Sequence, residues 1–120
     1  MRIIKSFANA FRGLYIFNLS ERNAWIHFGA AILVMATGFL FRIEPYEWIA
    51  VAFAIGIVFA AEAFNTAIER LSDVAQPNKD DRIRDVKDIS AAAVLICASA
   101  AACIGLIVFL PKMISLLFCA

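Results

Sequence analysis

The sequence predicts an all-α membrane protein with an N-terminal amphipathic surface helix and three transmembrane helices. The chain has 120 residues, of which 63% are hydrophobic, and its mean hydropathy is +0.83. A soluble domain is usually about 45–50% apolar, and one of this size cannot bury so much apolar surface. The apolar residues also form three long runs, with most of the charged residues gathered outside them. A soluble globular domain, a disordered tail and a fibrous repeat are therefore excluded.

Charge and cysteine content exclude two further classes of protein. The net charge of +1 argues against a nucleic-acid binder, which usually carries a strongly basic domain. Three cysteines are an odd number for a closed disulfide framework. All three lie in apolar surroundings, so we interpret them as small hydrophobic residues.

Residues 1–18 are expected to form a basic amphipathic helix in the headgroup region of the membrane. Apolar residues recur there at helical spacing, while basic and polar residues fall largely on the other side. The apolar set is Ile3, Ile4, Phe7, Phe11, Leu14 and Tyr15, and the polar set is Arg2, Lys5, Asn9 and Arg12.

Three apolar runs follow as the predicted spans. The first, 24–41, has a length of roughly 27 Å at 1.5 Å per residue, just enough to cross the hydrocarbon core. The second, 48–69, begins with an interfacial tryptophan and becomes polar towards its end. The third, 89–110, is rich in alanine and is expected to stop at Pro111. A strongly charged loop, 73–88, is expected between the second and third spans.

The distribution of basic residues predicts the orientation of the chain. Arg42 and Lys112 are the basic residues on one side of the spans, and the other nine are on the opposite side: Arg2, Lys5, Arg12, Arg22, Arg70, Lys79, Arg82, Arg84 and Lys87. The N-terminus and the charged loop are therefore expected in the cytoplasm, and the C-terminus outside.

The second span carries the residues that point to chemistry. Glu62, Asn65, Thr66, Glu69 and Asp73 follow one another at intervals of one to four residues, which places them on one face of a helix. An ionisable group inside a span costs several kcal/mol unless it is paired or hydrated, so it is a functional candidate by default. A structural polar seam between helices is the other interpretation. The face is expected to form a polar cleft that opens to the cytoplasm.

The two glutamates suit different roles. Glu69, at the surface, can hold Mg²⁺, which prefers one or two carboxylates together with phosphate oxygens. Glu62 lies deeper and can accept a proton from a lipid hydroxyl as a general base. Asn65 and Thr66 supply hydrogen bonds that orient these groups.

Other polar residues near the predicted cytoplasmic surface can each be interpreted in two ways. Glu21 begins the first span and is either a site carboxylate or a partner of the helix dipole. Lys87, like Arg2, either neutralises nucleotide phosphate or sets the membrane orientation, and Asp88 follows Lys87 at the start of the third span. His27 is interpreted as a satisfied interfacial histidine rather than a ligand.

Three functions remain to be weighed against these residues. A lipid kinase uses the whole set and needs an oligomer, because three spans cannot enclose both a lipid and ATP. The alternative is a small homo-oligomeric transporter with Glu62 as a proton or cation site, which needs neither Glu21 nor Glu69. A structural scaffold leaves Glu62 and Asn65 unexplained.

The motifs resemble those of the bacterial diacylglycerol kinase family, which includes the undecaprenol kinases. The residues that carry the resemblance are Glu62-Ala-Phe-Asn65-Thr66-Ala67-Ile68-Glu69 with Asp73, then Lys87-Asp88 followed by Ala91-Ala92-Ala93-Val94. The resemblance spans nearly the whole chain. Glu21-Arg22-Asn23 with Ile26-His27 looks more like the undecaprenol kinase branch.

The resemblance implies a homotrimer in the bacterial inner membrane that transfers the ATP γ-phosphate to a lipid hydroxyl with Mg²⁺. The product would be undecaprenyl phosphate or phosphatidic acid. Glu62 matches the family's catalytic base, and Glu21 and Glu69 match its metal-binding carboxylates. The expected nucleotide-binding residues are Arg2, Glu21, Asn65, Glu69, Lys87 and Asp88. The expected lipid-binding residues are Arg2, Trp48, Glu62 and Ala91.

Overall fold

The computed structural model describes residues 1–20 and 22–119, which form four helices and no strand. These are α1 (Arg2–Ser20), α2 (Arg22–Phe41), α3 (Pro45–Ala75) and α4 (Asp81–Phe118). The last three contain segments long and apolar enough to cross a membrane. The predicted fold class is therefore confirmed.

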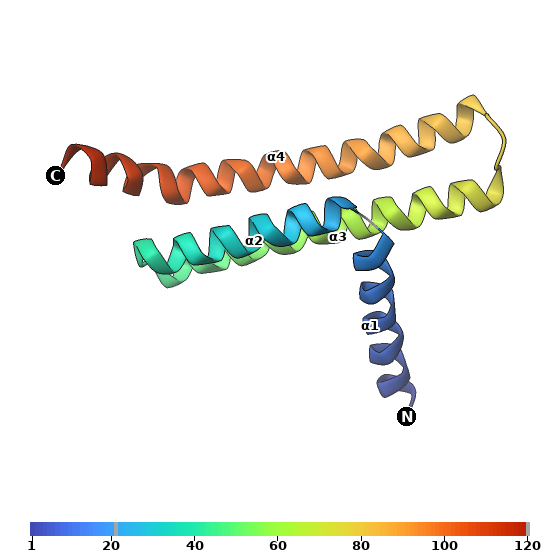
Figure 1. Cartoon of the computed structure of the whole chain (residues 1–120), viewed down its shortest axis with the longest axis horizontal. Helices are drawn as coiled ribbons and strands as arrows, with labels where there is room; N and C mark the ends of the chain where they lie inside the picture. The colour runs from blue at the N-terminus through green and yellow to red at the C-terminus, as the bar shows by residue number, and fades with distance from the viewer. Residues whose placement is uncertain (21, 120) are drawn as a thin grey trace.

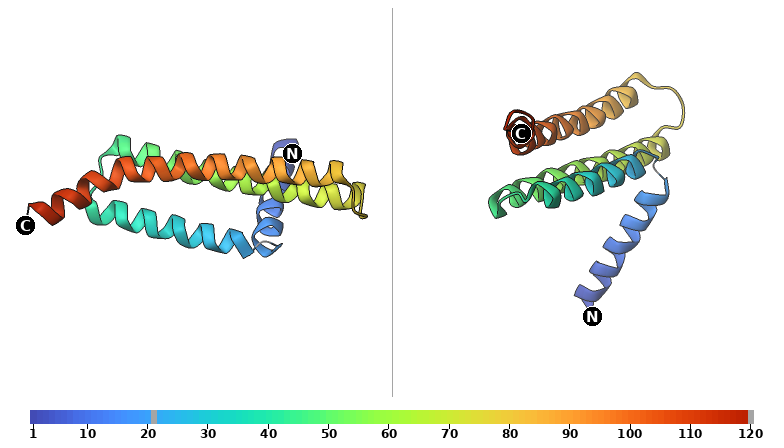
Figure 2. Two further views of the ribbon diagram at one scale, coloured as in Figure 1. Left: turned by 90° about the horizontal axis from the view of Figure 1, so that it is seen from above. Right: turned by 60° about the vertical axis from the view of Figure 1, so that its left-hand side comes forward.

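The helices form an elongated bundle from which α1 projects at a steep angle (Figure 1). The helices α2 and α3 form an antiparallel hairpin, and α4 runs back along α3 (Figures 1 and 2). Packing is most extensive between α3 and α4. A small apolar core, formed by Ile43, Val51 and Val108, lies near the α2–α3 turn. The predicted apolar stripe of α1 is exposed in the single chain, as expected for a helix that contacts a membrane surface or another chain.

The α2–α3 turn is fixed by a helix-ending motif. Arg42 adopts a left-handed conformation with φ 50°. Its N–H bonds the carbonyl of Phe39 at 3.3 Å, and the N–H of Ile43 bonds the carbonyl of Gly38 at 3.2 Å. This pair of bonds is the Schellman arrangement, which satisfies carbonyls that the end of a helix leaves free. The next helix then begins at Pro45, which suits the first helical position.

Polar caps fix the ends of α3 and α4. Glu47 Oε2 accepts the backbone N–H of Glu44 at 2.8 Å and lies 3.1 Å from Lys112 Nζ, so α4 is tied to the start of α3. At the other end, Asp80 accepts the N–H of Arg82 and caps α4. Hydrogen bonds from the Arg82 side chain and backbone lower the pKa of Asp80 to about 2.

Two expectations about helix length are wrong. Most of the charged segment 73–88 is helical, because α3 continues to Ala75 and α4 already begins at Asp81. Capping by Asp80 lets these charged residues start a helix. Nor does the last helix stop at Pro111, which lies inside α4. Proline removes its own hydrogen bond, but an established membrane helix tolerates that loss. The final turns of α4 bend away from its axis (Figure 2).

Close packing at Gly38 yields a prediction for stability. A Cβ at Gly38 would lie 2.7 Å from the Trp48 ring and 3.2 Å from Ile43 Cδ1, whereas one at Gly29 would meet nothing within 4 Å. We expect Gly38→Ala to destabilise the protein by about 1–3 kcal/mol, the usual cost of overpacking. Thermal unfolding in detergent measures this effect. Gly29→Ala, in the same helix, is the matched control and should leave the melting temperature unchanged or raised; equal melting temperatures for the two variants would contradict the prediction.

Candidate functional site

A buried carboxylate lies at the centre of the polar face of α3. Glu62 is 7% exposed, and its Oε1 lies 2.7 Å from His27 Nε2 on α2. One turn later, the hydroxyl of Thr66 donates to the backbone carbonyl of Glu62 at 3.0 Å and is buried with it. Burying an ionisable group is costly unless it is hydrogen-bonded, and His27 supplies that bond.

The partner of Glu62 is the residue that sequence reasoning undervalued. His27 is half-buried and bonded, as expected for a satisfied histidine, but the group that satisfies it is the candidate base itself. Helical periodicity cannot show this contact, since the two residues lie on different helices. The hairpin could have indicated it, because His27 lies 14 residues before the end of α2 at Phe41 and Glu62 lies 17 residues after the start of α3 at Pro45, which are similar distances from the turn.

Asn65 and Glu69 occupy the next two turns of α3. Asn65 Nδ2 lies 3.5 Å from Glu69 Oε1, a long hydrogen bond. Its other polar atom, Oδ1, is buried and has no hydrogen-bond partner in the described part of the chain, and the same is true of Ser90 Oγ on α4. Both residues line an otherwise apolar hollow of about 590 Å³ between α3 and α4. Buried polar atoms normally have a partner, so these two are candidates for contact with a ligand or another chain.

The oxygens of this face fit a hard cation. Mg²⁺ binds through one or two carboxylates plus phosphate oxygens, and Glu69 with the unpaired amide oxygen of Asn65 offers donors of that kind. Within residues 1–20 and 22–119, no three His, Cys, Asp or Glu side chains group closely enough to hold a metal by themselves. Glu21, the other predicted metal-binding residue, lies outside the described residues.

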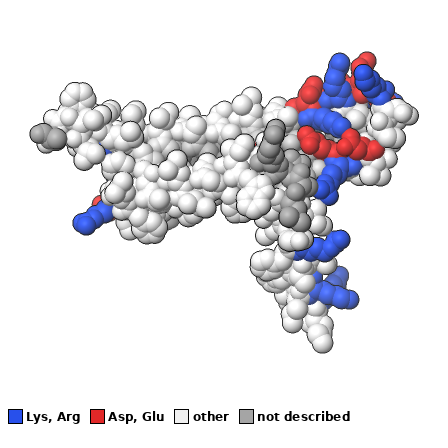
Figure 3. Space-filling view, in the orientation of Figure 1, with Lys and Arg blue, Asp and Glu red and all other residues white. Residues whose placement is uncertain are grey.

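Charged side chains gather where α3 ends and α4 begins (Figure 3). Lys87 Nζ lies 2.6 Å from Asp73 Oδ1 and joins the two helices. Both residues line a polar hollow of about 470 Å³, together with Gln76, Pro77, Asn78, Lys79, Asp80, Asp81, Ile83 and Arg84. Three basic residues and three aspartates line the hollow, so an anion such as a nucleotide phosphate would have to compete with these aspartates for the basic groups.

Other predicted site residues are not brought to Glu62 in the single chain. Trp48 lies about 21 Å along α3 from Glu62, at a rise of 1.5 Å per residue, and it packs against Phe39 near the α2–α3 turn. Arg2 begins the projecting helix α1 and is exposed (Figure 1). Asp88 and Ala91 are exposed on α4, next to buried Ser90.

Comparison of the sequence with known proteins assigns this chain to a family. Residues 8–109 match the prokaryotic diacylglycerol kinase family. The chain belongs to this family. It is 38% identical over 112 residues to an undecaprenol kinase from Bacillus subtilis, with 93% of this chain and 91% of that protein covered. It is also 28% identical over 116 residues to a diacylglycerol kinase from Synechocystis, with 96% of this chain and 66% of that protein covered.

Membership of the diacylglycerol kinase family confirms the resemblance stated from the motifs. The family match includes every predicted site residue except Arg2, which precedes it. With three apolar helices, the protein is an integral membrane protein. The family favours a kinase over the transporter that the sequence also allowed.

The Asp73–Lys87 pair gives a prediction about the charged end. Its two side chains are 67% and 36% exposed, and exposed ion pairs contribute roughly 0–1 kcal/mol. We therefore expect a coupling energy of no more than about 1 kcal/mol from a double-mutant cycle of Asp73→Asn and Lys87→Met, measured by unfolding in detergent. A coupling of several kcal/mol would show that the pair is a main structural link between α3 and α4. A weak coupling leaves Lys87 free to exchange Asp73 for a phosphate.

Proposed function

We propose that the protein is an ATP-dependent kinase that phosphorylates the hydroxyl of a membrane lipid. The observation that carries the proposal is the buried Glu62 carboxylate, on the same helix face as Asn65 and Glu69. That face leads from the apolar part of the bundle to the charged end formed by Asp73 and Lys87. A lipid hydroxyl and a nucleotide phosphate can therefore approach along one face from opposite directions.

Undecaprenol is the first candidate for the lipid. The undecaprenol kinase relative has the higher identity and is covered over nearly its whole length. The product would then be undecaprenyl phosphate. Diacylglycerol, which would give phosphatidic acid, is the second candidate, supported by the name of the other relative and of the family.

The proposed reaction is a direct transfer between two oxygens. Glu62 accepts the proton of the lipid hydroxyl, the hydroxyl oxygen forms a bond to the γ-phosphorus, and the bond from that phosphorus to the β-phosphate oxygen breaks to release ADP. Such a transfer depends mainly on positioning and electrostatic stabilisation. The burial of Glu62 and its bond to His27 support this role, because they hold the carboxylate of the base in one place.

Nucleotide binding is assigned to the more exposed end of the same face. Glu69 and Asn65, with Glu21, would hold Mg²⁺, which screens the charge of the phosphates when bound. Lys87 and Asp88 would bind the phosphates or the metal at the start of α4. The partial exposure of Lys87 and its pairing with the exposed carboxylate of Asp73 support this assignment.

A homotrimer is proposed as the working unit. In the single chain, only 6% of the apolar segment of α4 is fully buried, and α1 projects from the bundle (Figure 1). Arg2 is exposed at the start of the projecting helix α1, and Ala91 is exposed on α4. Both are therefore available to complete a site with a neighbouring copy of the chain. We further propose the bacterial inner membrane, with the N-terminus and the α3–α4 loop in the cytoplasm, on the basis of the basic residues gathered on that side.

The test of the proposed function is transfer of label from γ-labelled ATP in lipid nanodiscs with Mg²⁺. Undecaprenol and diacylglycerol are supplied separately, and the labelled lipid identifies both reaction and substrate. Absence of label from both lipids would overturn the proposal.

Glu62→Gln tests the base. The substitution keeps the shape of the side chain and removes the proton acceptor, so we expect kcat to fall at least about 100-fold, the usual contribution of a general base. Glu44→Gln, at the opposite end of the bundle, is the matched control and should retain full turnover. Near-normal turnover of Glu62→Gln would exclude Glu62 as the base.

Glu69→Ala and Glu21→Ala test the metal site. Both variants should require more Mg²⁺ for half-maximal activity, with little change in the KM for the lipid, because each removes a carboxylate expected to face the ion. Titration of activity against Mg²⁺ at saturating ATP measures this. The same Mg²⁺ dependence in both variants as in the unsubstituted protein would exclude the two glutamates as ligands.

A further inference from the structure

The ring of His27 is fixed in place against α3. It lies edge-on to Phe59, with ring centroids 6.3 Å apart and an interplanar angle of 69°. Phe59 in turn packs against Phe28 on α2, at 5.0 Å between centroids. Since Phe59 precedes Glu62 by about one helical turn, the face that carries the base also holds the histidine ring.

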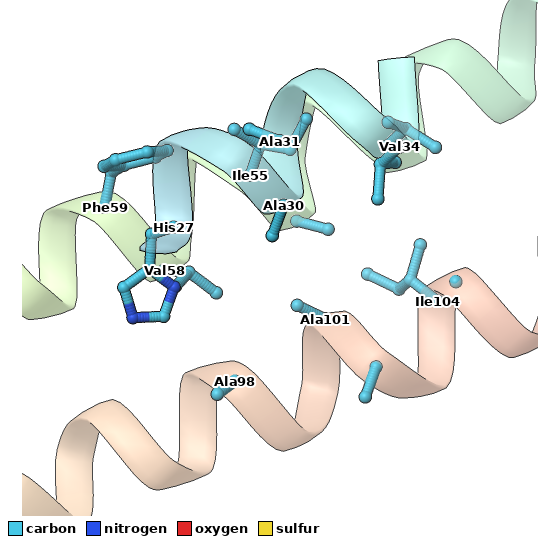
Figure 4. Close-up of a pocket in the computed structure, with 14 residues that line it drawn as sticks. His27, Ala30, Ala31, Val34, Ile55, Val58, Phe59, Ala98, Ala101 and Ile104 are labelled. Atoms are coloured by element: carbon cyan, nitrogen blue, oxygen red, sulfur yellow. The ribbon is translucent and has the colours of Figure 1, made fainter. Parts of the chain in front are cut away.

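His27 also marks the polar end of an apolar cavity. The cavity of about 290 Å³ lies between α2, α3 and α4, and every lining residue other than His27 is apolar or glycine. Ala98 and Ala101 approach it from α4, while Phe59 and Val58 lie beside the imidazole (Figure 4). Because no other lining residue is polar, the cavity offers the imidazole no competing hydrogen-bond partner, and its Nε2 is bonded to Glu62 Oε1 on α3.

The bond engages one oxygen of the base and leaves the other for chemistry. His27 Nε2 lies 2.7 Å from Glu62 Oε1, and the two side chains are 26% and 9% exposed. An ionised carboxylate only accepts hydrogen bonds, so Nε2 carries the proton whenever Glu62 is ionised, as a general base must be before it reacts. With Oε1 engaged, Oε2 is the oxygen left for the proton of a hydroxyl in the proposed reaction.

We propose that His27 is a positioning residue for catalysis, which donates its Nε2 proton to Glu62 Oε1 and so aims Oε2 at the lipid hydroxyl. This inference rests on the proposed function, because it takes Glu62 as the base. His27 does not touch the reacting atoms. It acts by keeping the carboxylate within the narrow range of positions that proton transfer requires.

Substitutions that separate hydrogen bonding from ring volume test the proposal. His27→Phe keeps an aromatic ring and removes the donor, so kcat should fall about 10- to 100-fold, the equivalent of one hydrogen bond to a charged group, with little change in the lipid KM. His27→Gln keeps an N–H donor and should recover most of the loss. In the Glu62→Gln background, His27→Phe should cause no further loss, because its effect passes through the base. Equal losses in both backgrounds, or equal losses for Phe and Gln, would overturn the proposal.

A spectroscopic measurement tests the contact without relying on turnover. The chain has a single histidine, so ¹⁵N-labelled histidine reports on this ring alone. Glu62→Gln should shift the Nε2 resonance, and the matched control Glu69→Gln should leave it unchanged. If the unsubstituted protein phosphorylates a lipid but Glu62→Gln leaves the Nε2 resonance unchanged, the positioning role alone is overturned. A protein that phosphorylates neither lipid would overturn the proposed function, and the positioning role with it.

Discussion

A carboxylate buried within a membrane-spanning helix is the constraint on which the rest of this structure depends. Glu62 is 7% exposed on α3, and an ionisable group at such a position needs a polar partner. That partner, His27, comes from another helix, so α2 must run antiparallel to α3 with one particular register. The Schellman turn at Arg42 and the close approach of Gly38 to Trp48 fix that register at the far end of the hairpin.

Stability and chemistry are separated along the bundle. The apolar core around Val51 and Val108 lies near the α2–α3 turn, where the Glu47–Lys112 pair also joins α3 to α4. The opposite half contains the polar face of α3, the hollow lined by Asn65 and Ser90, and the charged loop. The two unpaired polar atoms among the described residues, Asn65 Oδ1 and Ser90 Oγ, therefore lie away from the apolar core, where their lack of a partner does not disturb its packing.

The sequence predicts the helices and the polar face well, because both depend on local spacing. Apolar runs identify α2, α3 and α4, and intervals of three or four residues align Glu62 with Asn65 and Glu69. Helix ends were less predictable, since the capping of α4 by Asp80 and the passage of α4 through Pro111 depend on bonds that composition does not show.

Contacts between helices were the least predictable part of the site. The His27–Glu62 bond joins residues 35 apart, and the Asp73–Lys87 pair joins two helices across a loop. Each of these two contacts depends on where one helix ends and the next begins. Hydropathy predicts those positions only to within a few residues. The family motif identifies Glu62 and Lys87 as candidate site residues. Their contacts with His27 and Asp73 are visible only in the arrangement of α2, α3 and α4.

The unpaired atoms on α3 and α4 are consistent with the proposal that several copies of the chain form the working unit. Asn65 Oδ1 and Ser90 Oγ are buried without partners among the described residues, although they lie beside the proposed site and not in the apolar core. A polar atom buried in this way costs free energy unless a ligand, water or another chain bonds it.

Both atoms line one hollow, and α4 exposes its apolar segment next to that hollow. The same region therefore lacks both polar partners and apolar cover. In the proposed assembly, a second copy of the chain would supply cover, and a bound nucleotide with its metal would supply polar contacts. Assembly and substrate binding are thus expected to complete the same part of the molecule.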